Sequence, residues 1–133
     1  IADYVDRHPG TSKAFASLGL RRYLSALHYA KAAVGNSSSG IIEVPSFGIP
    51  SLNIGDRQKG RLASESVVNC GTGKDDILKG LRLCLSPEMR RRAKNADNPY
   101  AKDGTAGLIL DQLKHADIAA LRTKHFYDIP VKG

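Results

Sequence analysis

A short stretch of small polar residues constrains this chain more than any other feature. Residues 35–40 read Gly-Asn-Ser-Ser-Ser-Gly and separate a short apolar run, residues 32–34, from an apolar segment that begins at Ile41. Residues of this kind add little to a hydrophobic core, and their chemistry is that of turns and helix caps. The stretch, here called the serine loop, therefore predicts a tight connection between a short strand and a helix.

Apolar spacing and Gly or Pro breaks predict the remaining elements. Helices are expected over residues 19–33, from Ile41 to just before Gly48, over 74–85, over 87–95, and from an N-cap at Thr105 onward. Strands are expected over residues 49–54 and 66–70. Strands that alternate with helices predict an α/β fold with a parallel sheet. A chain of 133 residues has the size of one domain.

The serine loop has the chemistry of a phosphate site. In open parallel sheets, ligands bind beyond the carboxyl ends of the strands, and a helix that starts there offers free N–H groups and a positive dipole end. Glu43 follows, on what we expect to be the first turn of the helix, where a carboxylate can accept hydrogen bonds from the hydroxyls of a sugar. The residues alone leave open a purely structural role, in which the serines cap the helix and Glu43 completes the cap.

A second polar loop follows the next predicted strand and so should lie on the same edge of the sheet. Residues 55–61 read Gly-Asp-Arg-Gln-Lys-Gly-Arg and are called the basic loop below. Arg57 suits a diphosphate because its planar guanidinium binds oxyanions with two parallel hydrogen bonds. A solvated basic turn is the alternative explanation.

Charge favours an anionic partner. Lys and Arg number 20 against 13 Asp and Glu, which gives a formal net charge of +7. The densest basic run is residues 90–92, which we interpret as the solvated face of a helix. Only 6% of residues are aromatic, so side chains that could stack on bases are scarce, and nucleic-acid binding is kept only as an alternative.

Other classes of protein are disfavoured. No apolar stretch has the length that a membrane span needs, and the first residues lack the apolar core of a signal peptide, so we expect no membrane partner and a cytoplasmic location. Cys70 and Cys84 lack metal-ligand spacing, and we interpret both as buried reduced thiols. The four histidines are scattered, so we expect no metal and no cofactor; they are His8, His28, His115 and His125.

Two long blocks resemble one enzyme family. Residues 34–50 and 53–61 are similar to the carboxy-terminal half of the hydrolysing UDP-N-acetylglucosamine 2-epimerases, which make N-acetylmannosamine. Residues 15–24 and 124–128 resemble the same family. The resemblance implies a two-domain fold of the glycosyltransferase-B type. Residues 1–133 would then form one incomplete, Rossmann-like C-terminal domain that binds the nucleotide sugar, without the catalytic N-terminal domain.

The resemblance also implies roles for individual residues. The family's serine loop holds the diphosphate, its glutamate the ribose and its later arginine the phosphate, and an aromatic residue stacks on the uracil. Carried onto this sequence, the implied UDP-binding residues are Tyr23, Ser37, Ser38, Ser39, Gly40, Glu43 and Arg57. From its place on an apolar stripe, Tyr23 could equally belong to the core.

The family's catalytic groups have no match in this sequence. Relatives eliminate UDP across the C1–C2 bond of the sugar and hydrate the resulting glycal, using acidic residues of the first domain and a histidine early in the second. We assign no catalytic residue here and expect residues 1–133 alone to be inactive. A GDP-sugar 2-epimerase, a glycosyltransferase of the same fold and a homodimer of the full-length protein stay open.

Overall fold

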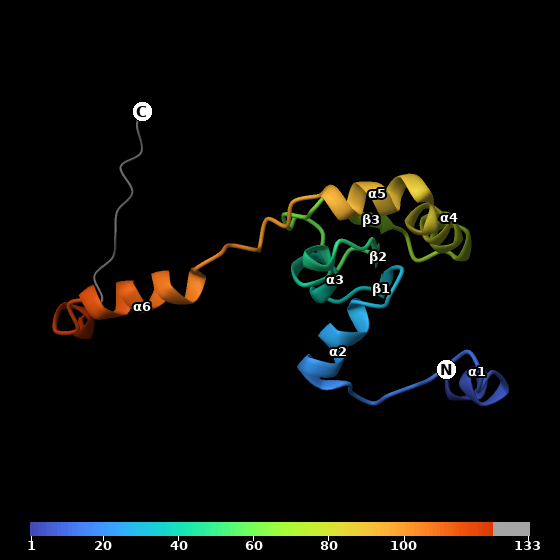
Figure 1. Ribbon diagram of the computed structural model, residues 1–133, viewed down its shortest axis with the longest axis horizontal. Helices are drawn as coiled ribbons and strands as arrows, with labels where there is room; N and C mark the ends of the chain where they lie inside the picture. The colour runs from blue at the N-terminus through green and yellow to red at the C-terminus, as the bar shows by residue number, and fades with distance from the viewer. Residues whose placement is uncertain (124–133) are drawn as a thin grey trace. The chain divides into compact units, whose positions relative to one another are not determined.

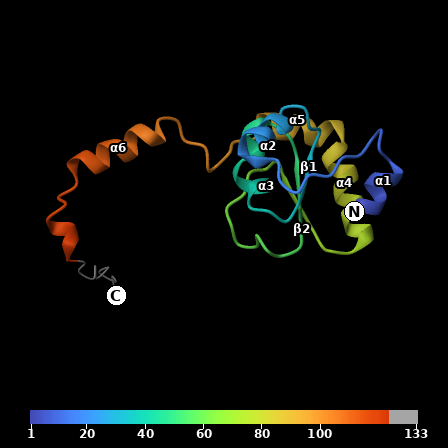
Figure 2. The ribbon, with the colours of Figure 1, turned by 90° about the horizontal axis from the view of Figure 1, so that it is seen from below.

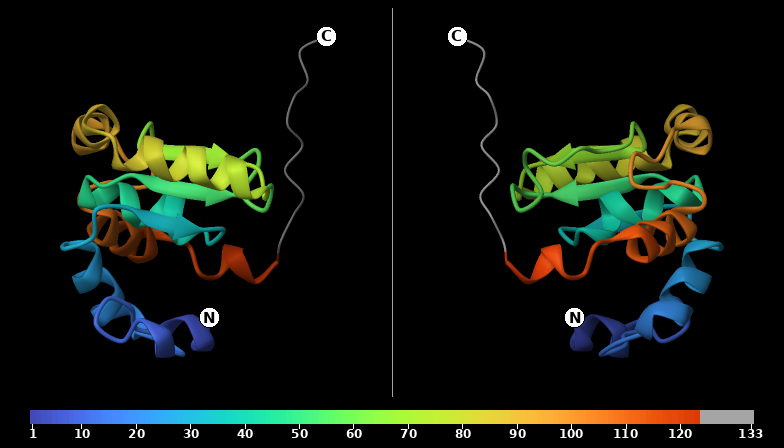
Figure 3. Two further views of the ribbon diagram at one scale, coloured as in Figure 1. Left: turned by 90° about the vertical axis from the view of Figure 1, so that its right-hand side faces the viewer. Right: turned by 90° about the vertical axis from the view of Figure 1, so that its left-hand side faces the viewer.

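The computed structural model of the chain describes residues 1–123. Its centre is a three-stranded parallel sheet in the order β1 (Ala33–Gly35), β2 (Ser51–Ile54), β3 (Val67–Cys70) (Figure 1). Val34 pairs with Leu52, which pairs with Val68. Figure 3 shows the three strands side by side. The parallel α/β sheet predicted from the sequence is confirmed.

Helices cover both faces of this sheet. The helix α3 (Ser39–Ile42) packs on one face, and it lies so close to the sheet that a Cβ atom added to Gly40 would be 2.7 Å from Oγ of Ser51. The helix α4 (Lys74–Leu85) packs so closely on Leu52 that a Cβ atom added to Gly80 would overlap its side chain. Consecutive side chains of a strand point to opposite faces, so α3 and α4 lie on opposite sides of β2.

The core is small and centred on β2. Leu52 is completely buried, and α5 (Pro87–Asn95) adds Met89 and Ala93 to the same core. Ser86 caps α5 by accepting a hydrogen bond from the Met89 N–H at 3.1 Å, which explains why this helix begins where the sequence predicts. The other buried apolar side chains are Leu27, Ile41, Val44 and Cys84.

Two helices come before the first strand of the sheet. They are α1 (Ala2–Arg7) and α2 (Gly19–Leu27). The prediction that one helix runs over residues 19–33 is wrong at its end, because Ala33 belongs to β1 and donates its N–H to the carbonyl of Pro50 at 2.9 Å. No residue between Leu27 and Ala33 is a helix breaker, so strand pairing, and not local sequence, ends α2.

The connection from β1 to β2 is also more broken than predicted. The helix α3 begins two residues before Ile41 and ends at Ile42, and a 3-10 helix, η1 (Val44–Phe47), follows it. Pro45 explains the break, because it has no N–H to donate and its ring clashes with the carbonyl of Ile41 in an α-helix. Gly48 ends η1 in the left-handed conformation with φ +63°.

The chain divides into two compact units between Ala101 and Lys102. The described part of the second unit contains α6 (Thr105–His115) and η2 (Ala120–Arg122). Thr105 is the first helical residue and not the N-cap: Gly104 occupies that position with φ +73°, and the Thr105 hydroxyl donates to the Lys102 carbonyl. His125 and the family-like block 124–128 lie outside the described residues.

The two cysteines are free thiols. Cys84 is buried on α4, as predicted, whereas Cys70 is only half-buried because it ends the edge strand β3. Burial raises the pKa of both thiols, with the Asp76 carboxylate as a second cause at Cys70 and the Cys70 thiol as a second cause at Cys84.

Candidate functional site

A pocket of about 600 Å³ lies where β1 and β2 meet α2 and α3. The three elements α2, α3 and β1 are next to one another in Figures 1 and 2. The pocket includes the first turn of α3, so it lies at the carboxyl edge of the sheet, where ligands of open α/β sheets bind. Its volume is in the range of small-molecule sites. The polar side chains that line this carboxyl-edge pocket are Tyr23, Ser37, Ser39, Glu43, Ser51 and Asn53.

Tyr23 projects from α2 into this pocket. Its ring is half-buried, and its hydroxyl is hydrogen-bonded to the hydroxyl of Ser39. This hydrogen bond joins α2 to the first turn of α3 across 16 residues of sequence and holds the Tyr23 ring in position in the pocket. Tyr23 is therefore a wall of the pocket and is not fully enclosed in the core, which was the alternative at this position.

The serines of the serine loop have different surroundings. Ser37 lines the pocket and also acts as a cap: its Oγ accepts from the Ser39 N–H at 3.3 Å and its carbonyl accepts from the Gly40 N–H at 3.1 Å. Ser38 is the N-cap of α3 but makes no side-chain capping bond, and it is not among the residues that line the pocket. With only four residues, α3 contributes little dipole, so hydroxyls and single N–H groups carry most of any anion binding here.

Glu43 is the most unusual residue of the pocket. The carboxylate oxygen Oε2 is buried and has no hydrogen-bond partner within the described part of the protein. Glu43 is not on the first turn of the helix, as the sequence predicted, but is the C-cap of α3, because α3 begins at Ser39 and lasts four residues. A capping box, in which the glutamate bonds the N-cap backbone, is not formed. A buried acceptor without a donor costs about 1–3 kcal/mol, so a ligand donor would be strongly favoured here.

The basic loop lies beside the serine loop, as predicted. The Nε2 atom of buried Gln58 donates to the carbonyl of Asn36 at 2.9 Å, which ties the two loops together. A second pocket of about 420 Å³ is lined by this loop and by the ends of β2 and β3, and Lys59 and Arg61 contribute positive charge to it. Asn53 lines both pockets, so the two cavities are neighbours on one edge of the sheet.

Arg57 follows β2 on the basic loop and is exposed to solvent. It lies on the predicted edge of the sheet but is not among the residues that line either pocket. The structure thus brings five of the seven predicted site residues around one cavity, namely Tyr23, Ser37, Ser39, Gly40 and Glu43, while Ser38 and Arg57 do not line it.

Sequence reasoning missed two polar residues at this edge. Asn53 is 5% exposed and donates from Nδ2 to Oδ1 of Asn69 at 2.8 Å, and Gln58 is 7% exposed. A polar residue near the end of a buried strand is a signal that could have found Asn53. Nothing local to the basic loop distinguishes Gln58 from its exposed neighbours.

Residues 1–123 contain neither a candidate metal site nor a candidate membrane span. No group of three or more His, Cys, Asp or Glu side chains in this part of the chain is arranged to hold a metal ion. None of the described helices is both long and apolar enough to cross a bilayer.

A parallel sheet with helices on both faces and a pocket at its carboxyl edge defines the Rossmann-like class of α/β domains. The profile of the family described as UDP-N-acetylglucosamine 2-epimerase matches residues 1–114. The chain therefore belongs to the UDP-N-acetylglucosamine 2-epimerase family, and the resemblance noted in its sequence is confirmed.

Curated relatives agree with this assignment. The chain is 37% identical over 112 residues to the polysialic acid biosynthesis protein P7 of Escherichia coli, with 81% of this chain and 28% of the relative covered. It is 35% identical over 130 residues to a hydrolysing GDP/UDP-N,N'-diacetylbacillosamine 2-epimerase of Campylobacter jejuni, with 97% of this chain and 33% of the relative covered. The chain spans about a third of the length of these relatives.

A solved structure has the same fold. A chain described as a candidate UDP-N-acetylglucosamine 2-epimerase from Listeria monocytogenes superimposes with a TM-score of 0.68 at 20% sequence identity. The match covers 98% of this chain and 36% of the other. At this identity the likeness establishes the fold and nothing finer.

Proposed function

We propose that this chain binds the UDP part of the substrate in a hydrolysing UDP-N-acetylglucosamine 2-epimerase. In the proposed reaction, a base removes the proton at C2 of the sugar while the C1–O bond to UDP breaks, which leaves a glycal. The oxygen of a water molecule then adds at C1, and a proton is added at C2 on the face opposite to the one from which the first proton was removed. The products are N-acetylmannosamine and UDP. The family assignment supports the class of enzyme.

The observation that carries the proposal is the unpartnered carboxylate of Glu43. Glu43 lines a cavity of nucleotide-compatible size, and its buried Oε2 lacks a donor among residues 1–123. The two vicinal hydroxyls of a ribose are suitable donors, since a carboxylate accepts from both through charge-assisted hydrogen bonds. We therefore assign the ribose to Glu43.

The remaining contacts follow from the position of the ribose. The ring of Tyr23 is a flat wall on which the base can stack, with its orientation held by the bond to Ser39. We assign the diphosphate to the hydroxyls of Ser37, Ser38 and Ser39 and to the turn at Gly40. Arg57 is exposed and unpaired among residues 1–123, so we propose that it reaches the diphosphate from the basic loop.

We assign no catalytic residue to this chain. The proton-transfer groups of the reaction would come from a separate N-terminal domain and from a histidine early in the C-terminal domain, with residues 1–133 as an incomplete C-terminal domain that is inactive alone. The cytoplasmic location and the homodimer stay predictions.

One relative favours a second candidate substrate. The Campylobacter jejuni enzyme, which matches nearly the whole chain, is named for both GDP- and UDP-linked diacetylbacillosamine. A diacetamido sugar on either nucleotide is therefore the alternative to UDP-N-acetylglucosamine. Tyr23 could stack on guanine as well as on uracil.

The test is calorimetric titration of UDP and of GDP into the full-length protein, with Glu43→Gln as the key variant. The amide keeps the shape of the side chain but loses the charge, so we expect UDP affinity to fall by about tenfold or more. Glu65→Gln is the matched control, because Glu65 is exposed and pairs with Arg92. Equal affinities of wild type and Glu43→Gln would contradict the ribose assignment.

Turnover and Arg57 provide two further checks. Incubation of the full-length protein with UDP-N-acetylglucosamine should release UDP and N-acetylmannosamine, detectable by NMR. Arg57→Ala should weaken UDP binding by about 1.5–3 kcal/mol, the cost of a lost charge-assisted contact. Release of a different sugar, or of GDP from a GDP-linked substrate alone, would favour the second candidate.

A further inference from the structure

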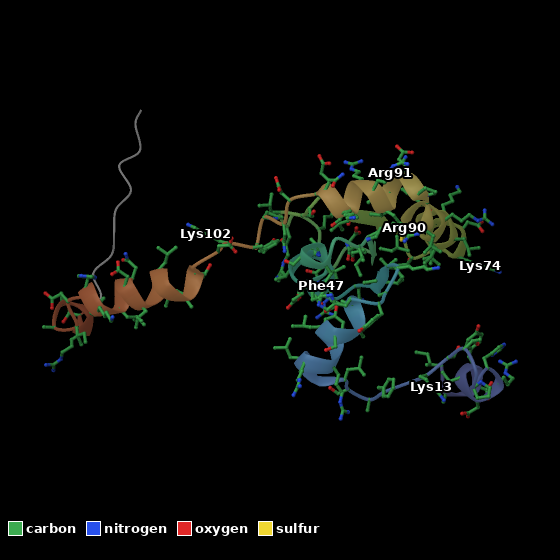
Figure 4. The ribbon with its side chains drawn as sticks, in the orientation of Figure 1. Lys13, Phe47, Lys74, Arg90, Arg91 and Lys102 are labelled. Atoms are coloured by element: carbon green, nitrogen blue, oxygen red, sulfur yellow. The ribbon has the colours of Figure 1, made fainter. Side chains whose placement is uncertain are left out.

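The edge of the sheet opposite the serine loop carries a separate, strongly basic cavity. It has a volume of about 370 Å³ and lies beside the turns that precede β1 and β2, so it is at the amino ends of these strands. Lys31 comes from the turn before β1, and Gly48 to Pro50 come from the turn before β2. The third wall is α5, and Figure 4 labels two of its arginines, Arg90 and Arg91. We call this cavity the amino-edge pocket; its charged lining residues are Lys31, Arg90, Arg91 and Lys94.

The helical spacing of α5 directs these charges to one side. Met89 and Ala93 are one turn apart and buried, so they define the core-facing side of the helix. Arg90, Arg91 and Lys94 occupy a neighbouring sector and line the pocket. The basic run is therefore more than a uniformly solvated face.

The arginine run divides into two environments. Arg92 donates from Nε to Oε2 of Glu65 at 3.2 Å and does not line the pocket. By contrast, within residues 1–123 the four pocket cations take part in no ion pair, and no acidic side chain lines the cavity. Four uncompensated cations around one hollow repel one another and create a strongly positive potential there.

The frame of the pocket is rigid. Pro50 and Pro87 are lining residues with fixed φ angles, and Pro50 is fully buried. Gly48 gives its turn the left-handed φ of +63° and lies next to α5, since a Cβ atom at this position would be in ordinary contact, 3.4 Å from the Cα of Lys94. The cavity is thus defined by backbone contacts as well as by long side chains.

We propose that the amino-edge pocket binds a small anion with two or more negative charges, such as a diphosphate or a multiply phosphorylated metabolite. Four cations converge on one concavity of small-molecule size, which suits a compact polyanion and not an extended strand. The lining residues include no aromatic side chain on which a base could stack, which disfavours single-stranded nucleic acid. Ala30 is the one lining residue that this site shares with the carboxyl-edge pocket, and the proposal does not rest on the proposed function.

The test is calorimetric titration of inorganic pyrophosphate into the full-length protein, with matched neighbouring variants. Arg91→Gln removes a pocket cation, and Arg92→Gln removes the adjacent arginine outside the pocket. We expect Arg91→Gln to weaken one pyrophosphate-binding event by about tenfold or more, and Arg92→Gln to change it by less than about twofold. All of these side chains are exposed, and the melting temperature of each variant checks its folding.

Further variants separate the possible sources of binding. Lys31→Gln, on a different element, should weaken the same binding event, whereas Ser37→Val at the other edge should leave it intact. Equal losses in Arg91→Gln and Arg92→Gln would mean diffuse attraction by net charge and would overturn the proposal. Loss of all pyrophosphate binding in Ser37→Val, or tight binding of a short DNA duplex in place of pyrophosphate, would overturn it as well.

Discussion

Substitution of Gly40 by alanine tests how the serine loop is held on the sheet. In the structure, the added Cβ atom would lie 2.7 Å from Oγ of Ser51, well inside the 3.4 Å at which ordinary contact begins. Ser51 is 2% exposed on the central strand, so its hydroxyl has little room to move. Overpacking of this kind costs about 1–3 kcal/mol. Alanine gains about 0.5–1 kcal/mol over glycine in a helix, which leaves a net loss centred on about 1 kcal/mol.

A double-mutant cycle identifies the cause of this loss. Ser51→Ala removes the obstructing Oγ, and its Cβ atom would lie 3.9 Å from the new methyl group, an ordinary contact. Gly40→Ala combined with Ser51→Ala should therefore be more stable than the sum of the single effects predicts, by about 1–2 kcal/mol. Urea denaturation of the full-length protein measures this coupling through the midpoint at constant slope.

The affinity for UDP provides a second readout. If Gly40 acts through packing, Gly40→Ala weakens UDP binding because α3 shifts, and Ser51→Ala restores much of the affinity. Full stability of Gly40→Ala, or the absence of any coupling with Ser51→Ala, would refute the packing argument. Weak binding in a double variant of normal stability would show instead that the ligand itself needs the space at Gly40.

Two further predictions concern the loop contact and the thiols. Gln58→Leu removes the hydrogen bond to the Asn36 carbonyl. We expect this substitution to weaken UDP binding about three- to tenfold by calorimetry, while the free energy of unfolding changes by no more than about 1 kcal/mol. Unchanged affinity would mean that the two loops act independently. Burial raises the pKa of Cys84 and Cys70 above their ordinary value of 9.0. As the pH rises, the thiols of the unfolded chain therefore lose their protons before those of the folded chain do. The free energy of unfolding should fall as the pH rises above that value. The midpoint of urea denaturation, measured from about pH 8 to pH 10, checks this prediction. We expect the midpoint to decline less in Cys84→Ala than in the wild type, and a midpoint that rises with pH would contradict the prediction.

Much of the fold could be predicted because its signals are local. The bounds of α4 and α5 agree with the sequence, since Gly73 and the Ser86–Pro87 pair mark the helix ends through backbone conformation and capping. The parallel sheet followed from the alternation of strands and helices. These features depend on residues a few positions apart, where the sequence holds the whole argument.

The errors arose where distant segments compete with local preference. The end of α2 was placed too late because pairing with Pro50 and Ser51 draws Ala33 into a strand. The break of α3 at Pro45 was a local signal that sequence reasoning passed over. As a consequence Glu43 was expected near the start of the helix, whereas it caps its end.

What the sequence by itself determined was the class of fold, the family and the two loops at one edge of the sheet. Turn chemistry, helix caps and hydrophobic spacing act within one or two turns of chain, so they can be interpreted without coordinates. Only the tertiary structure decided that Gln58 joins the loops, that Glu43 lines a cavity while its buried Oε2 has no partner among residues 1–123, and that Arg91 lines the amino-edge pocket whereas Arg92 pairs with an acidic side chain. Burial and pairing of these side chains depend on residues far away in sequence, such as Asn36 and Glu65, which folding alone brings next to them.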